Sequence, residues 1–137
     1  MWKGLVVALL LAGCVQLPPS AQDIQAKQFQ PVPDKAVVYI VRDNLGAQLD
    51  DTLWLGDSEM ITTHTGTYYR WEVAPGTRRI AGFGISNASL TLNAEAGKIY
   101  FVRHGVIGTA RSGVQLSFLE RMDEQTGRAR VAQASLL

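Results

Sequence analysis

The sequence has little of what would identify a binding partner or a reaction. It contains one cysteine in 137 residues, which excludes an internal disulfide and a zinc site built from clustered cysteines. Its 13 basic and 12 acidic residues give a net charge of +1, so no excess of positive charge predicts a nucleic-acid partner. With 47% hydrophobic residues, the chain is nonetheless too apolar for a disordered tail, and its length is that of one domain.

Motifs for catalysis and metal binding are also missing. The sequence has no G-x-S-x-G turn that would expose a serine nucleophile. His64 and His104 have no further ligand at zinc-binding spacing, which favours surface or strand-end histidines. An acidic cluster without EF-hand spacing predicts a solvated turn; it consists of Asp50, Asp51, Asp57 and Glu59. We therefore expect no catalytic residue, no metal and no cofactor.

The N-terminus has the pattern of a secreted protein. Lys3 supplies a positive charge, and Gly4–Ala12 is an uncharged apolar run that fits a signal peptide but is too short to span a membrane. The run ends in Leu11-Ala12-Gly13-Cys14, which resembles the lipobox of bacterial lipoproteins. That resemblance implies removal of residues 1–13 and acylation of Cys14. The alternative is a buried N-terminal helix with an incidental cysteine.

An acylated Cys14 predicts the lipid bilayer as a partner and the bacterial cell envelope as the location. Removal of residues 1–13 also removes Lys3, which leaves 12 basic and 12 acidic residues, so acyl chains rather than a basic patch would provide the attachment. Val15 stands where lipoproteins of this kind carry aspartate when they stay in the inner membrane. It therefore favours the outer membrane, with the domain facing the periplasm.

Residues 14–34 have the composition of an acylated N-terminus followed by a flexible tether. Four of the five prolines lie in this segment, glutamine is frequent, and no apolar period continues through it. A short helical turn near Ile24–Phe29, with Phe29 docked on the domain, is an open alternative. We expect the folded domain to occupy residues 35–137.

The remaining sequence predicts an all-β fold. Ala36–Arg42 is rich in β-branched and aromatic residues on both faces, which is typical of a central strand covered on each side. Short strands recur at regular spacing with turn residues between them, which predicts a small antiparallel β-sandwich of about seven or eight strands. A short helix is an alternative for the segment after residue 120, although Gly127 lowers the helix propensity there. The other expected strands are 52–55, 59–63, 67–73, 78–83, 88–93, 98–104 and 114–118, with a glycine-rich loop at 105–113.

The strand at 67–73 alternates in polarity, so its two faces can be distinguished. Tyr69 and Trp71 lie on the more apolar face, which we expect to point into the core. Tyr68 and Arg70 lie on the other face, which we expect to point outward.

Several strand and turn segments form a recognisable set, namely Ala36–Arg42, Gly66–Arg70, Ala74–Thr77 and Ala94–Val102. Together they resemble the bacterial lipoproteins grouped as domain of unknown function 2846. The resemblance covers about residues 34–119, in addition to the lipobox, and it implies a small β-sandwich similar to PEGA modules. None of these segments is a catalytic signature, so the resemblance implies no particular activity.

Three classes of function are compatible with this sequence, and we expect the first. It is a non-catalytic envelope module that binds a protein or wall component through a sheet edge or a loop. The second is a cell-wall glycan-binding module, for which Trp54 and Tyr68 are the aromatic side chains expected outside the core. The third is a hydrolase that uses His104 with a nearby acidic residue, which a histidine–carboxylate pair in a pocket would favour.

Overall fold

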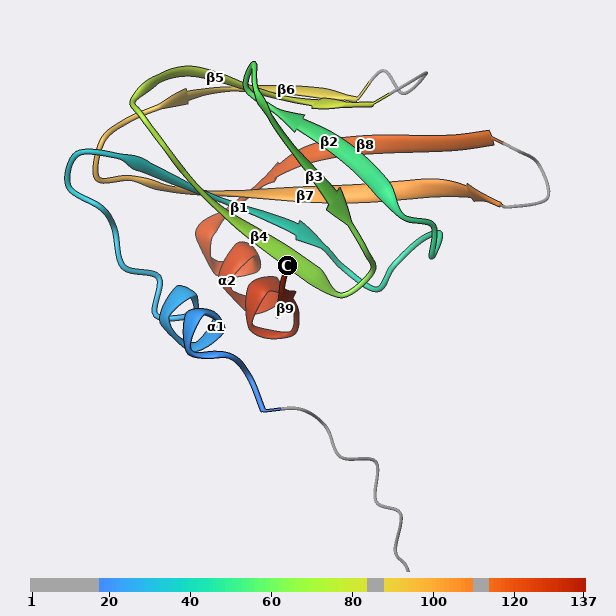
Figure 1. Ribbon diagram of the computed structural model, residues 1–137, viewed down its shortest axis with the longest axis horizontal. Helices are drawn as coiled ribbons and strands as arrows, with labels where there is room; N and C mark the ends of the chain where they lie inside the picture. Colours follow the sequence, from blue (N-terminus) through green and yellow to red (C-terminus); the bar gives the residue numbers. More distant parts are fainter. Residues whose placement is uncertain (1–17, 84–87, 110–113) are drawn as a thin grey trace, which may run out of the picture.

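The computed structural model describes residues 18–83, 88–109 and 114–137. Two sheets face each other, and both helices lie against the outer face of the larger sheet (Figure 1). The prediction of an all-β sandwich is confirmed. The proposed signal peptide and the acylation site Cys14 lie outside the described residues, so both stay predictions.

The described part of the chain contains nine strands and two helices. Neither helix has the length and apolar character needed to cross a bilayer. The elements are α1 (Ala21–Ala26), β1 (Ala36–Arg42), β2 (Asp51–Leu55), β3 (Glu59–Thr63), β4 (Thr67–Val73), β5 (Gly76–Gly82), β6 (Ser89–Ala94), β7 (Ile99–Thr109), β8 (Val114–Met122), α2 (Glu124–Ala132) and β9 (Ser135–Leu136).

The larger sheet has the order β8-β7-β1-β4-β9 and the smaller one the order β3-β2-β5-β6. β1 is central, as predicted, and every one of its residues is buried. The larger sheet is not wholly antiparallel, because β1 pairs with β7, and β4 with β9, in the parallel sense. Parallel pairing needs a long connection between the strands, and the chain makes it by passing through the smaller sheet between β4 and β7.

The core between the sheets is apolar. Val38 and Ile40 of β1 belong to one cluster with Leu53 and Ile80 of the smaller sheet, and all four are fully buried. Trp71 belongs to the same cluster and exposes 6% of its surface. The prediction that Trp71 points into the core is therefore confirmed.

A second apolar cluster covers the outer face of the larger sheet. Tyr39, Tyr68 and Phe101 come from three neighbouring strands and lie in this cluster with Val131 of α2. Tyr68 points away from the core between the sheets, as predicted, but it is fully buried, so the expectation that its side chain is exposed is wrong. Alternation separates the two faces of a strand, but it does not show whether helices cover the second face.

Gly127 allows α2 to approach the sheet closely. A Cβ atom at this position would lie 2.2 Å from Phe101 Cγ, so a larger residue would displace the ring. The glycine that lowers helix propensity is thus the one that permits the helix to dock.

The segment before the first strand packs on the sheet. Ser20 caps α1 by accepting a hydrogen bond from the Asp23 N–H, and Ala26 is only 5% exposed. Phe29 lies with its ring centroid 5.3 Å from that of Tyr39, so the alternative of a docked Phe29 is confirmed. The prediction of a flexible tether over 14–34 is therefore wrong for residues 20–32, from which Ala26, Phe29 and Val32 pack on the sheet.

β7 continues into the segment predicted to be a glycine-rich loop. It pairs with β8 as far as Thr109, so the loop predicted at 105–113 is wrong for residues 105–109, while 110–113 lie outside the described residues. Gly105 serves this pairing, because a Cβ there would lie 1.9 Å from the Phe118 ring. His104 consequently lies within a strand and not at its end.

Candidate functional site

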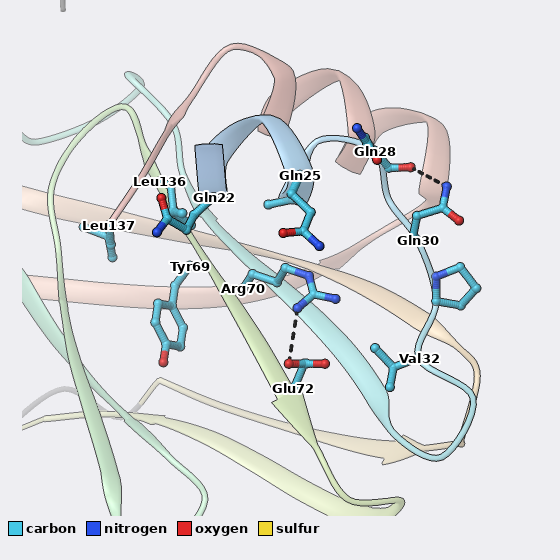
Figure 2. Close-up of a pocket in the computed structure, with 12 residues that line it drawn as sticks. Gln22, Gln25, Gln28, Gln30, Val32, Tyr69, Arg70, Glu72, Leu136 and Leu137 are labelled. Carbon is cyan, nitrogen blue, oxygen red and sulfur yellow. Dashed lines mark hydrogen bonds and ion pairs between the residues drawn. The ribbon is translucent and has the colours of Figure 1, made fainter. Parts of the chain in front are cut away.

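A groove of about 600 Å³ lies between β4 and the segment that contains α1 (Figure 2). Arg70 and Glu72 of β4 project into it, and Leu136 lies at one end with Val32 at the other (Figure 2). Carboxamide side chains line the helical wall, namely Gln22, Gln25, Gln28 and Gln30. The sequence carries one signal for this groove, the frequent glutamines, which composition alone assigns to a tether.

The backbone of β4 is open along the groove. β9 pairs only with Thr67 and Tyr68, and the Leu137 N–H donates to the Tyr68 carbonyl oxygen at 2.9 Å. Peptide groups alternate in direction along a strand, so those of Arg70 and Glu72 point to the same edge as that of Tyr68. No backbone group of the described residues pairs with them there. The groove therefore borders an unpaired sheet edge.

The charged groups of the groove balance each other. Arg70 Nη1 lies 3.5 Å from Glu72 Oε2, a partly exposed ion pair of the kind that contributes little to stability. Each glutamine carboxamide offers one acceptor and two N–H donors. An unpaired strand edge opposite a row of carboxamides can satisfy the hydrogen bonds of another peptide backbone.

A buried carboxylate fixes α1 beside the groove. Asp23 Oδ1 accepts from the Tyr68 hydroxyl at 2.6 Å, and Oδ2 accepts from Lys27 Nζ at 3.1 Å. Burial raises the pKa of Asp23, but the hydrogen bonds from Tyr68 and Lys27 outweigh it, so the pKa lies below its usual value. Burial, together with the hydrogen bond to Asp23, raises the pKa of Tyr68. Lys27 Nζ also donates to the Ala134 carbonyl oxygen at 2.7 Å, which ties the helix to the C-terminal segment.

His104 occupies a buried hydrogen-bonded network. Its Nε2 lies 2.9 Å from Asp51 Oδ2, and its Nδ1 lies 3.0 Å from Thr63 Oγ1. Carboxylate, imidazole and hydroxyl follow each other as they do in a hydrolase triad. However, His104 is 0% and Thr63 1% exposed, so no substrate carbonyl can reach the hydroxyl.

The same network joins the two sheets. Arg42 of β1 is fully buried, and its Nη1 donates to Thr63 Oγ1 at 3.2 Å. Burial lowers the pKa of Arg42, an effect that the nearby carboxylates, Asp51 first, partly offset. Burial raises the pKa of Asp51, but the hydrogen bond and charge of His104 outweigh it, and the net pKa is lowered. These contacts between β1, β2, β3 and β7 make the network a structural link.

His64 lies at the surface and pairs with one residue of the acidic cluster. Its Nδ1 is 2.6 Å from Asp50 Oδ1, and both side chains are more than half exposed. Asp51 pairs instead with His104, and Glu59 accepts a hydrogen bond from the Tyr69 hydroxyl, so the residues of the acidic cluster have separate partners. No group of three or more potential metal ligands occurs among the residues that the structure describes.

The structure separates the two aromatic side chains considered for glycan binding. Tyr68 is buried under the helices, whereas Trp54 is 37% exposed on the smaller sheet. Phe83, for which the sequence gives no signal, is 53% exposed beside it. The groove and this aromatic pair lie on different sheets.

Comparison with known proteins identifies a distant relative. No family profile and no solved structure matches the chain. The chain is 27% identical over 136 residues to an uncharacterized protein of Haemophilus influenzae, a match that covers 95% of this chain and 79% of that protein. The resemblance to domain of unknown function 2846 stays a prediction.

Proposed function

We propose that this protein is a lipid-anchored module of the bacterial envelope that binds an extended peptide segment and catalyses no reaction. One observation carries the proposal: the peptide groups of Arg70 and Glu72 face the groove at an unpaired sheet edge. A peptide bound there would extend the larger sheet by strand addition, with main-chain hydrogen bonds supplying affinity.

β9 illustrates how this edge accepts a strand. It lies parallel to β4, and the N–H groups of Ser135 and Leu137 donate to the carbonyl oxygens of Gly66 and Tyr68 at 2.9 Å each. A peptide in line with β9 would meet the next peptide groups of β4, those of Arg70 and Glu72. Its side chains would alternate between the groove and the opposite face of the sheet.

The surroundings of the two histidines support binding over catalysis. His104 and Thr63 are buried, and both ring nitrogens of His104 and the Thr63 hydroxyl have partners within the fold. His64 has a carboxylate partner but is more than half exposed. An active site requires a nucleophile, a base and an orienting group around a space for substrate.

The lipobox supports the location. Leu11-Ala12-Gly13-Cys14 ends an apolar run of signal-peptide length, and Val15 is the residue that favours the outer membrane. The partner would then be a protein of the envelope with an extended segment that reaches the groove.

A proline at position 72 tests the strand-addition mechanism. Glu72→Pro removes the N–H that faces the groove, whereas the matched control Glu72→Ala removes the same carboxylate and keeps the N–H. Both leave the pairing with β1 in place, because the neighbouring residues Trp71 and Val73 carry the hydrogen bonds on that side. Edge positions tolerate proline, and thermal unfolding of both variants checks the fold.

The readout uses a photo-crosslinking amino acid in place of Gln25 in cells that express the full-length chain. We expect an adduct with one segment of an envelope protein in the wild type and in Glu72→Ala, and its loss in Glu72→Pro. A synthetic peptide of that segment should bind the purified protein and slow hydrogen exchange at Arg70 and Glu72. Equal crosslinking in the two variants, or an adduct with glycan alone, would contradict the proposal.

A further inference from the structure

Charge in the groove is confined to two side chains. Among the described residues that line it, Arg70 and Glu72 are charged, and the other side chains are apolar, phenolic or carboxamide. A carboxamide offers both a donor and acceptors, so the glutamines can bind a group of either charge. Any selection of charge on a bound peptide therefore depends on Arg70 and Glu72.

The two charged side chains lie side by side on one face of β4. They are two residues apart, so both project from the face of the larger sheet that bears the helices, as Figure 2 shows. Arg70 Nη1 lies 3.5 Å from Glu72 Oε2, and the two side chains are 24% and 44% exposed. A guanidinium has five N–H donors and a carboxylate has two acceptor oxygens. Each group can therefore bind a second partner of opposite charge without leaving the first.

The fold holds the positive charge of the groove in place. Tyr39 of β1 is fully buried and stands opposite Arg70 in the pairing of β1 with β4. Burial raises the pKa of Tyr39 and outweighs the hydrogen bond and the charge of Arg70, which lower it. The Tyr39 hydroxyl in turn donates to the Ala26 carbonyl oxygen of α1. Arg70 is thus held against a buried tyrosine that is tied to the helical wall.

The register of β9 determines which residues of an added strand meet these charges. β9 is parallel to β4, with Ser135 beside Thr67 and Leu136 beside Tyr68. A peptide that continues in line with β9 has one residue beside Arg70 and, two positions later in its sequence, another beside Glu72. Both of these residues point into the groove, whereas the one between them points to the opposite face. Because the pairing is parallel, the residue beside Arg70 comes first.

We propose that the groove selects a peptide with an acidic residue, an uncharged strand-forming residue and a basic residue, in this order from its N-terminus. The inference rests on the proposed strand addition and adds to it the chemistry of the partner. Side chains of opposite charge on neighbouring strands stabilise the pairing, and like charges destabilise it. In the proposed order, each of the four charges has an opposite charge beside it on the other strand. The reverse order places like charges together at both positions.

Two synthetic peptides of identical composition test the order of charges. They are Thr-Val-Thr-Glu-Val-Lys-Thr-Val-Thr and Thr-Val-Thr-Lys-Val-Glu-Thr-Val-Thr, blocked at both ends and labelled with a fluorophore at the same end. Fluorescence anisotropy with the detergent-solubilised full-length protein measures their affinities. We expect the Glu-Val-Lys peptide to bind at least about fivefold more tightly, because two cross-strand pairs change from unlike to like charges in the other peptide.

Two double variants test whether Arg70 and Glu72 make this selection. Arg70→Glu combined with Glu72→Arg exchanges the charges, keeps the peptide groups of β4 and should reverse the preference. The matched control, Arg70→Gln combined with Glu72→Gln, removes both charges, keeps the same peptide groups and should bind the two peptides equally. Circular dichroism checks the fold of both variants, and the comparison of the two peptides on the wild type depends on neither.

The proposed order of charges and strand addition itself can fail separately. Equal binding of the two peptides to the wild type, tighter binding of the Lys-Val-Glu peptide, or a preference that survives in the double glutamine variant would each overturn the order of charges. In those cases, slowed hydrogen exchange at Arg70 and Glu72 would still support strand addition. Binding of neither peptide would also reject the order of charges as the basis of recognition. The crosslink from position 25, compared between Glu72→Ala and Glu72→Pro, would then decide whether strand addition is retained.

Discussion

Tyr68 and Asp23 are 45 residues apart in the sequence, and a hydrogen bond of 2.6 Å joins the phenol of one to the carboxylate of the other. The bond connects β4 to α1. The Asp23 side chain is 8% exposed, so water cannot readily replace a lost partner. The helical wall of the groove therefore depends on this pair.

Tyr68→Phe should lower the free energy of unfolding by about 1.5–3 kcal/mol, because it removes a hydrogen bond to a charged, buried group. Tyr100→Phe is the matched control. Its hydroxyl donates to the neutral carbonyl oxygen of Asn93 at 3.2 Å, so its loss should cost about 1 kcal/mol. Urea denaturation measures both, and equal losses would show that the charge of Asp23 contributes nothing.

Acidification should destabilise the protein below about pH 4. The pKa values of Asp23 and Asp51 lie below their usual value of 3.8 in the folded state. A carboxyl group with a lowered pKa in the folded state binds protons less readily there than in the unfolded chain. Its ionised form therefore stabilises the folded protein at a pH above the pKa of the unfolded chain. This stabilisation is lost as the pH falls through the pKa of the folded state. The free energy of unfolding, measured from about pH 7 down to about pH 2, should therefore stay constant at first and then fall as the solution becomes acidic. Asp51→Asn should make this fall shallower.

His104→Ala should cost about 3–5 kcal/mol of unfolding free energy, because it removes a fully buried side chain and takes the imidazole partner from the Asp51 carboxylate, whose side chain is only 11% exposed. His64→Ala, at an exposed pair, should cost at most about 1 kcal/mol. If the network has no catalytic role, a His104 variant stabilised by a second-site substitution should retain ligand binding. A stable His104 variant that loses a cellular function while keeping its ligands would contradict the non-catalytic proposal.

Gly127→Ala should destabilise the protein by about 1–3 kcal/mol even though alanine is the better helix former. The added Cβ would clash with the Phe101 ring, so Phe101→Leu should offset part of the loss in the double variant. Gln125→Ala, at an exposed position of the same helix, is the control and should be neutral or slightly stabilising. A stabilising effect at position 127 would show that the helix can move away from the sheet.

Cys14→Ser should prevent acylation and leave an unprocessed or soluble protein, because residues 14–137 carry no net charge that would hold a processed chain to anionic lipid. The measurement is the intact mass of the protein extracted from membranes, compared between the wild type and the variant. A wild-type chain without a lipid adduct on Cys14 would contradict the proposed anchor.

The strands were largely predictable because their sequences alternate or are continuously apolar. β1 is a run of β-branched and aromatic residues, and the hairpin of β2 and β3 follows from its turn at Gly56–Ser58. The inward position of Trp71 follows from alternation alone. The local sequence was sufficient to predict these strands because the repeat of apolar residues lies within each strand.

The sites were less predictable because they depend on contacts between distant segments. The approach of His104 to Asp51 depends on how the two sheets pack, and the extension of β7 to Thr109 depends on Phe118 filling the space above Gly105. The helical side of the groove was missed since its glutamines have no apolar period. α1 is held mainly by Asp23 and Phe29, which no local pattern distinguishes from tether residues.

The packing of α1 also sets how far the protein can stand from a membrane. Between a lipidated Cys14 and the helix cap at Ser20, a fully extended chain spans at most about 20 Å. An anchored molecule would therefore be held with α1, and with it the mouth of the groove, close to the lipid headgroups. If the groove binds a peptide, as proposed, that peptide should come from a neighbour resident at the same bilayer surface and not from a protein that diffuses freely through the periplasm.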